Sequence, residues 1–97
     1  MPATLDQNTL DARLESLSGW RYADGALVKT YTRKGFRGAT VFACYIAEVA
    51  ESLNHHPDVN IHGYNKVTVT STTHDSGGVT DNDVQLARRI DEIVPQA

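Results

Sequence analysis

The chain has 97 residues, of which 40% are hydrophobic and 22% are charged, and its formal net charge at pH 7 is -3. This length fits one compact domain, so we expect residues 1–97 to form a single unit. The acidic balance argues against direct binding to nucleic acid, because neutralising phosphates requires a basic surface. No apolar run approaches the roughly 20 residues that span a bilayer, and Met1 to Leu10 lacks the pattern of a secretion signal. We therefore expect a soluble protein without membrane contact.

The single cysteine, Cys44, limits both the compartment and the chemistry of the protein. One cysteine excludes an intrachain disulfide and a cysteine-rich zinc site, which fits a reducing, cytoplasmic location. Because Cys44 lies among apolar residues, we expect a buried structural thiol rather than a nucleophile.

The first predicted element is a short helix. Leucines recur at helical spacing at Leu10, Leu14 and Leu17. Either Asn8 or Thr9 is expected to cap the start of this helix, and Ser18-Gly19 supplies its stop.

Two hairpins are predicted on either side of the chain centre. In the first, Trp20–Tyr22 and Ala26–Arg33 flank Asp24-Gly25, a pair that tolerates the positive φ angles of a tight turn. In the second, Val59–Tyr64 and Lys66–His74 are rich in residues that favour strands. These segments predict four antiparallel strands.

A long helix is predicted between the hairpins, over residues 36–53. One apolar stripe is expected to cover the sheet and consists of Phe36, Ala39, Ala43, Ile46, Ala50 and Leu53. A second apolar set consists of Val41, Phe42, Tyr45 and Val49. Because one sheet face does not need both sets, we expect self-association into a homodimer or homotetramer. The alternative is that the first helix packs over the second set.

A last helix is predicted after the turn Asp75–Gly78. Thr80 and Asp83 have the spacing of a capping box, and Pro95 marks the end of the helix. The apolar residues of its buried side are Val84, Leu86, Ala87, Ile90, Ile93 and Val94. The order α-β-β-α-β-β-α favours an α+β fold, in which helices cover mainly one face of a four-stranded antiparallel sheet.

Histidines at the two ends of the second predicted hairpin form the main functional signal. Helical spacing places Glu51 one turn before His55, so the Glu51 carboxylate is expected to hydrogen-bond that imidazole. Because adjacent side chains diverge, one of His55 and His56 could transfer a proton while the other holds substrate or packs against it. His74, from a strand end, could approach the same place and complete an acid/base pair.

Two alternatives stay open at this point. His-His-Pro is also a common surface turn at the end of a helix. A metal site is the other alternative, with His55, His56, His62 and His74 as candidate ligands, although the familiar helical spacing of metal-binding histidines is missing. His62 lies within a predicted strand and is interpreted as an ordinary strand residue.

The motif as a whole resembles the pterin-4a-carbinolamine dehydratases. The resemblance rests on Glu51 to Pro57 (Glu-Ser-Leu-Asn-His-His-Pro), Tyr64 to Val67, Thr73 to Asp75, Gly77 to Thr80, and Asp83. Leu17 to Trp20 and Leu86 to Asp91 also resemble the family, so the similarity covers nearly the whole chain.

The resemblance implies dehydration of 4a-hydroxytetrahydropterin to quinonoid dihydropterin, a step of tetrahydrobiopterin recycling. No metal or added cofactor is implied, and the partner is a small pterin substrate. His55, His56, His74 and Glu51 correspond to catalytic positions, and His55 and His74 form the acid/base pair in an order that stays open. The positions implied to line the pterin pocket are Asn54, Thr72, Thr73 and Asp75, with Asp83 as a supporting motif residue.

A different class of function is the alternative. Members of this family also serve as dimerisation partners of a transcription factor, and dehydratase-like relatives assist assembly of a carboxylase. The retention of His55, His56 and His74 favours the enzyme, because a scaffold has no need to keep proton carriers aligned.

Overall fold

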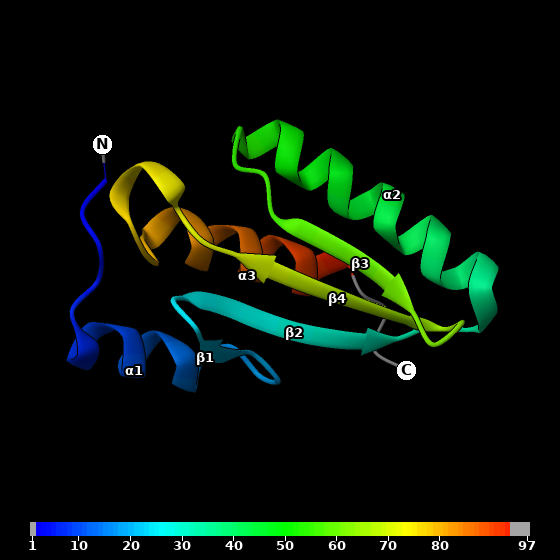
Figure 1. Cartoon of the computed structure of the whole chain (residues 1–97), viewed down its shortest axis with the longest axis horizontal. Coiled ribbons are helices and arrows are strands. Elements are labelled where there is room, and N and C mark those ends of the chain that lie inside the picture. The colour runs from blue at the N-terminus through cyan, green and yellow to red at the C-terminus, as the bar shows by residue number, and fades with distance from the viewer. Residues whose placement is uncertain (1, 94–97) are drawn as a thin grey trace.

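A computed structural model of the chain describes residues 2–93. The helices are α1 (Gln7–Glu15), α2 (Gly35–Leu53) and α3 (Asp81–Ile93), and a 3-10 turn, η1, covers His74–Ser76. The strands are β1 (Arg21–Ala23), β2 (Ala26–Thr32), β3 (Asp58–His62) and β4 (Lys66–Ser71). They form one antiparallel sheet in the order β1-β2-β4-β3, with β2 and β4 at its centre. The predicted fold is confirmed (Figure 1).

The two faces of the sheet differ because side chains alternate along each strand. On β4, Val67, Val69 and Ser71 are fully buried, whereas Thr68 and Thr70 are half-buried. The helices pack on the valine face, where α2 contacts β3 and β4 and α3 contacts β2. The largest fully buried apolar side chains of this layer are Leu27, Ile46, Leu86, Ile90, Val67, Val69 and Val84.

The first helix begins earlier than the sequence predicts. Asp6 caps α1, and its Oδ1 accepts a hydrogen bond from the Thr9 backbone N–H at 2.8 Å. That bond lowers the pKa of Asp6. The predicted cap at Asn8 or Thr9 is therefore wrong, because a carboxylate three residues before Thr9 can satisfy a free N–H of the first turn.

Two predictions about the sides of α2 are also wrong. Phe36 is 61% exposed, whereas Phe42 and Val49, which the sequence places in the second set, are buried. Cys44 is exposed rather than buried. Among residues 2–93, no helix combines the length and hydrophobicity needed to cross a membrane.

The outer apolar residues of α2 remain uncovered by α1. Val41 is 48% exposed and Tyr45 is 58% exposed, so the alternative in which the first helix covers this set is wrong. Val41 and Tyr45 lie one helical turn apart and form an exposed apolar patch on the outside of α2, which we call the α2 patch. Phe36 is exposed on another side of the helix, roughly half a turn around the axis from Tyr45.

A polar cluster joins α3 to β2 at the far end of the sheet from η1. Asp91 accepts hydrogen bonds from Trp20 Nε1 at 3.1 Å, Lys29 Nζ at 3.0 Å and Tyr31 Oη at 2.6 Å. Burial raises the pKa of Tyr31, and the neighbouring Asp91 carboxylate raises it further. The phenol therefore stays protonated and holds the C-terminal half of α3 against the central strand.

The second hairpin differs in length from its prediction. β4 ends at Ser71, three residues before the predicted end at His74, which instead opens η1. The bridge between Thr73 and Gly78 closes this turn, and Gly77 adopts φ 77°, a conformation that glycine reaches without strain. The predicted helix end at Pro95, and Val94 before it, lie outside the described residues.

Candidate active site

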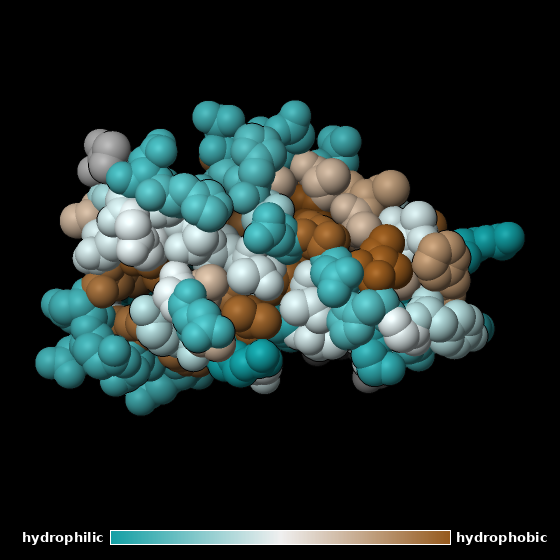
Figure 2. Space-filling view, in the orientation of Figure 1, coloured by the Kyte–Doolittle hydropathy of each residue, from teal (hydrophilic) through white to brown (hydrophobic). Residues whose placement is uncertain are grey.

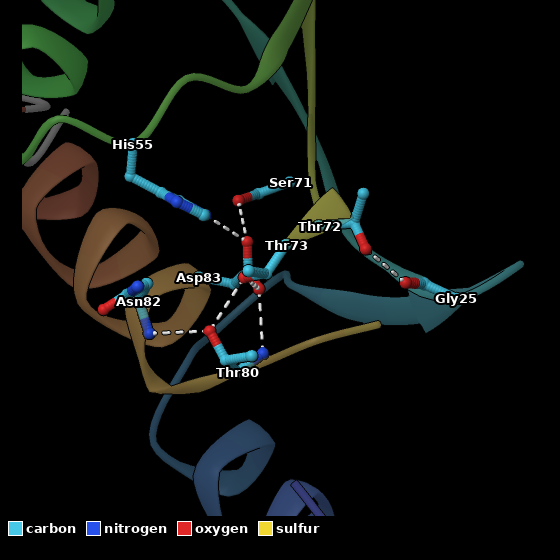
Figure 3. Close-up of polar contacts among 8 residues, drawn as sticks. All are labelled: Gly25, His55, Ser71, Thr72, Thr73, Thr80, Asn82 and Asp83. Carbon is cyan, nitrogen blue, oxygen red and sulfur yellow. Dashed lines mark hydrogen bonds and ion pairs between the residues drawn. The ribbon is translucent and has the colours of Figure 1, made fainter. Parts of the chain in front are cut away.

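Asp83 lies at the centre of a buried polar cluster. Its side chain has no exposed surface, and it comes from the first turn of α3. Figure 3 shows hydrogen bonds joining it to His55, just after α2, and to Ser71 and Thr73, at and just after the end of β4. The cluster consists of His55, Ser71, Thr73, Thr80 and Asp83, and we call it the Asp83 cluster.

Each carboxylate oxygen of Asp83 accepts two hydrogen bonds. Oδ1 accepts from His55 Nε2 and from Ser71 Oγ, both at 2.6 Å. Oδ2 accepts from Thr73 Oγ1 and from the Thr80 backbone N–H, both at 2.8 Å. All four partners carry hydrogens that they can donate to the carboxylate, which is the arrangement that suits an ionised carboxyl group.

The sequence predicts only part of this arrangement. The spacing of Thr80 and Asp83 predicts a capping interaction, and the Thr80 N–H does donate to Asp83. The same carboxylate also binds an imidazole 28 positions earlier in the chain. Asp83 therefore serves the start of α3 and the orientation of His55 together.

The hydrogen bond to Asp83 fixes how the His55 ring is used. His55 faces Asp83 through Nε2, so in the neutral imidazole a proton on Nε2 is the arrangement that completes this hydrogen bond, with Nδ1 then the acceptor. The His55 side chain is 12% exposed. One ring nitrogen is thus engaged inside the protein, and within residues 2–93 Nδ1 has no hydrogen-bond partner.

His55 reaches Asp83 because of how α2 ends. Asn54 caps the helix in the left-handed conformation, with φ 50° and ψ 43°, which asparagine tolerates better than most residues. The His55 backbone N–H donates to the Ala50 carbonyl at 3.0 Å and closes the final turn. The chain then leaves the helix, so helical spacing no longer describes where the next side chains point.

The predicted hydrogen bond between Glu51 and His55 is wrong for this reason. Glu51 Oε2 lies 2.5 Å from His56 Nε2 instead, and the side chains of Glu51 and His56 are 72% and 58% exposed. The left-handed Asn54 turns His55 toward α3 and brings His56 back over the last turn of α2. The carboxylate that supports His55 comes from Asp83.

A cavity of about 420 Å³ lies beside the Glu51–His56 pair. Its lining is largely apolar and consists of Ile46, Ala47, Ala50, Glu51, His56, Pro57 and Val59. Figure 2 shows apolar surface between α2 and β3, the two elements that supply most of these residues. A flat apolar ligand could rest here with polar groups at the rim.

His74 is connected to His55 through its neighbour. Thr73, directly before His74, donates to the carboxylate that binds His55. The His74 side chain itself is exposed at the start of η1. Within residues 2–93 its ring makes no hydrogen bond or ion pair, so the direct approach of His74 to His55 stays a prediction.

The remaining predicted substrate contacts are distributed around this region. Asn54 and Asp75 are exposed, at the end of α2 and within η1. Thr72 Oγ1 donates to the Gly25 carbonyl at 2.9 Å, so its hydroxyl faces the β1–β2 turn and not Asp83. Their contact with a pterin stays a prediction.

The sequence does not predict two members of the Asp83 cluster, Ser71 and Thr80, as site residues. Strand alternation places Ser71 on the face of Val67 and Val69, where a hydroxyl is unusual, and this unusual position is the sequence signal that could identify Ser71.

His62, the last residue of β3, bonds Thr68 Oγ1 at 2.7 Å. In the described part of the chain, no group of three or more histidine, cysteine or acidic side chains is arranged to hold a metal ion.

Known proteins resemble this chain over almost its whole length. The family described as pterin 4 alpha carbinolamine dehydratase matches residues 3–93. A Thermomicrobium roseum protein, provisionally named pterin-4-alpha-carbinolamine dehydratase, is 44% identical and aligns over 94% of this chain and 97% of its own length. A Herpetosiphon aurantiacus protein with the same provisional name is 45% identical over 96% of both chains.

Solved structures agree with this similarity. A transcriptional coactivator/pterin dehydratase from Brucella melitensis superimposes with a TM-score of 0.87 at 34% identity, covering 95% of this chain and 99% of that one. A pterin dehydratase-like protein identified as a RuBisCO assembly factor of the α-carboxysome has a TM-score of 0.65 at 21% identity, covering 81% and 93%. The second likeness shows the fold alone. The matches over the full domain show that the chain belongs to the pterin 4 alpha carbinolamine dehydratase family.

Proposed function

We propose that this protein catalyses the dehydration of 4a-hydroxytetrahydropterin to quinonoid dihydropterin, in the recycling of tetrahydrobiopterin. Membership of the dehydratase family supports the substrate class. The observation that carries the catalytic role is the 2.6 Å contact between His55 and the fully buried Asp83, because a scaffold has no use for an imidazole with a fixed tautomer.

The reaction requires an acid and a base. The acid protonates the 4a-hydroxyl, which leaves as water when the C4a–O bond breaks, and the base takes the proton of N5 as the C4a=N5 double bond forms. His55 supplies one role through Nδ1, with Asp83 stabilising its charged form. His74 supplies the other role, and one proton taken balances one proton given.

The exposed Glu51–His56 pair has a different role. It lies at the rim of the apolar cavity between α2 and β3, where a hydrogen-bonded imidazole can hold the polar edge of a pterin. We assign His56 to substrate orientation, with Glu51 as its support. Asn54, Thr72, Thr73 and Asp75 are assigned to substrate contacts outside this cavity, since none of them lines it.

The proposal is tested by stopped-flow measurement of 4a-hydroxytetrahydropterin breakdown with the purified protein. EDTA in the assay separates histidine catalysis from a metal-dependent reaction. We expect His55→Gln to lower kcat by about 100-fold or more, the range for losing a general acid or base. His62→Gln is the matched control, because His62 is an exposed histidine that bonds only a threonine of the neighbouring strand. Equal turnover by the His55 and His62 variants would reject the assignment.

The α2 patch supports a second proposal, that copies of this chain associate as a homodimer or homotetramer. Val41 and Tyr45 are 48% and 58% exposed one turn apart on the same side of α2, and burying such a patch is favourable in water. A non-catalytic role as a dimerisation or assembly partner would use the same patch as its binding surface. A dehydratase assay separates that role from the enzyme.

A further inference from the structure

Ser71 is a buried hydroxyl at the end of β4 that the proposed mechanism does not yet use. Its side chain has no exposed surface, and it follows the buried Val67 and Val69 on the same face of the sheet. Burying a hydroxyl costs free energy unless it finds a hydrogen-bond partner. Its partner is Asp83 Oδ1, at 2.6 Å.

Ser71 is distinguished by which oxygen it contacts. Thr73 and the Thr80 backbone hold Oδ2, and the Thr80 bond also serves the start of α3. Ser71 shares Oδ1 with His55, so the two groups occupy both acceptor sites of that oxygen. Figure 3 shows Ser71 and His55 approaching that oxygen from different sides.

This sharing has two physical consequences. Two donors on Oδ1 and two on Oδ2 fix the plane of the carboxylate, and therefore the orientation of the His55 ring bound to it. The fixed Oδ1 also faces Nε2, and a correctly placed acceptor favours the proton of neutral His55 on that nitrogen.

We propose that Ser71 is a positioning residue that acts through Asp83 to hold His55 in the Nε2–H tautomer, so that Nδ1 is the nitrogen that exchanges a proton with substrate. The catalytic consequence rests on the proposed dehydratase function. The tautomer itself can be measured in the protein without substrate.

Three substitutions separate the hydroxyl from the volume of Ser71. Ser71→Ala removes the donor and leaves a small void. Ser71→Cys fills the space with a poor donor, and Ser71→Thr keeps a hydroxyl. Ser52→Ala is the matched control, because Ser52 bonds only the Val49 carbonyl of its own helix.

Nitrogen-15 spectra of the imidazoles report which nitrogen carries the proton. The chain has four histidines, and the signals missing from His55→Gln identify those of His55. We expect Nε2–H for His55 in the unsubstituted protein and in Ser71→Thr and Ser52→Ala. In Ser71→Ala and Ser71→Cys, we expect the His55 nitrogen shifts to move toward a mixture of tautomers and kcat to fall about tenfold with KM nearly unchanged, roughly the effect of one hydrogen bond to a charged group.

The pattern of outcomes distinguishes the two proposals. If Ser71→Cys matches the unsubstituted protein in both tautomer and kcat, Ser71 only fills space and the inference is rejected. An Nδ1–H tautomer in the unsubstituted protein also rejects it. If the tautomer responds to Ser71 while no variant, nor the unsubstituted protein, dehydrates the pterin, the control of His55 by Ser71 stands and the dehydratase function fails.

Discussion

His55 Nε2 lies 2.6 Å from Asp83 Oδ1, although 28 positions of the chain separate the two residues. The contact joins the end of α2 to the start of α3. The side chain of His55 is 12% exposed, and that of Asp83 is fully buried. Removing one partner of a buried hydrogen bond leaves the other group unsatisfied, so substitutions at this pair are expected to be costly.

Asp83→Asn is expected to damage both stability and turnover. An amide nitrogen cannot accept the hydrogen bonds of Asp83, so at least one donor of the cluster loses its partner and the free energy of unfolding falls by about 1–3 kcal/mol. Turnover is expected to fall by about 100-fold, because His55 loses the charge that stabilises its protonated form. Urea unfolding and stopped-flow assays measure the two effects.

Asp81→Asn provides the control for this substitution, since Asp81 lies in the same helical turn but is 59% exposed. It is expected to change stability by less than about 0.5 kcal/mol and to leave turnover intact. Similar losses in both variants would mean that charge near the start of α3, and not the contact with His55, determines the result.

Glu51→Gln is expected to affect substrate binding more than the chemical step. Glu51 and His56 are 72% and 58% exposed, so their bond contributes under about 1 kcal/mol to stability. If His56 orients the pterin, KM rises about threefold to tenfold while kcat changes little. Steady-state kinetics measure both constants, and a loss confined to kcat would place Glu51 in the proton-transfer step.

Tyr31 is expected to remain protonated in alkaline solution as long as the protein is folded. Burial and the Asp91 carboxylate raise the pKa of Tyr31. A raised folded-state pKa gives stability that is fully present below the unfolded pKa of about 10 and is lost as the pH rises above it. The tyrosinate absorbance of folded Tyr31→Phe should match that of the unsubstituted protein, and the two should differ only after unfolding. A larger signal from the folded unsubstituted protein would contradict this prediction.

Tyr45→Glu is expected to weaken self-association through the α2 patch. A charge at a position 58% exposed in the single chain does not disturb the core, but it is costly to bury at an interface. Sedimentation should show multiples of 10.6 kDa for the unsubstituted protein and a higher dissociation constant for the variant. Thr40→Glu, an exposed position of α2 on a different side of the helix from Tyr45, is the control. A mass of one chain for the unsubstituted protein at micromolar concentration would refute the patch as an interface.

Local patterns in the sequence predict the elements of this fold well, because strand alternation and helical spacing are properties of neighbouring residues. The hairpin at Asp24-Gly25 and the apolar side of α3 are of this kind. The hydrogen-bond partner of His55 does not follow from such local patterns. It depends on the left-handed turn at Asn54 and on where α3 crosses the sheet, and helical spacing therefore selected Glu51 in place of Asp83.

Ser71 is a second example of a contact that local sequence patterns do not predict. Its position on the buried face follows from alternation with Val67 and Val69, but nothing within the strand indicates that a carboxylate from α3 would meet it. Resemblance to a family identifies Asp83 as a motif position and does not by itself give its contacts.

The dual use of Asp83 constrains how the protein can be engineered for heat resistance. Replacements that only improve the first turn of α3 would also withdraw the anion beside His55, so gains in melting temperature at this residue would come at the expense of turnover. The opposite end of α3 is free of that conflict, because Asp91 bonds Trp20, Lys29 and Tyr31 away from the Asp83 cluster. Libraries for robust variants should be directed there.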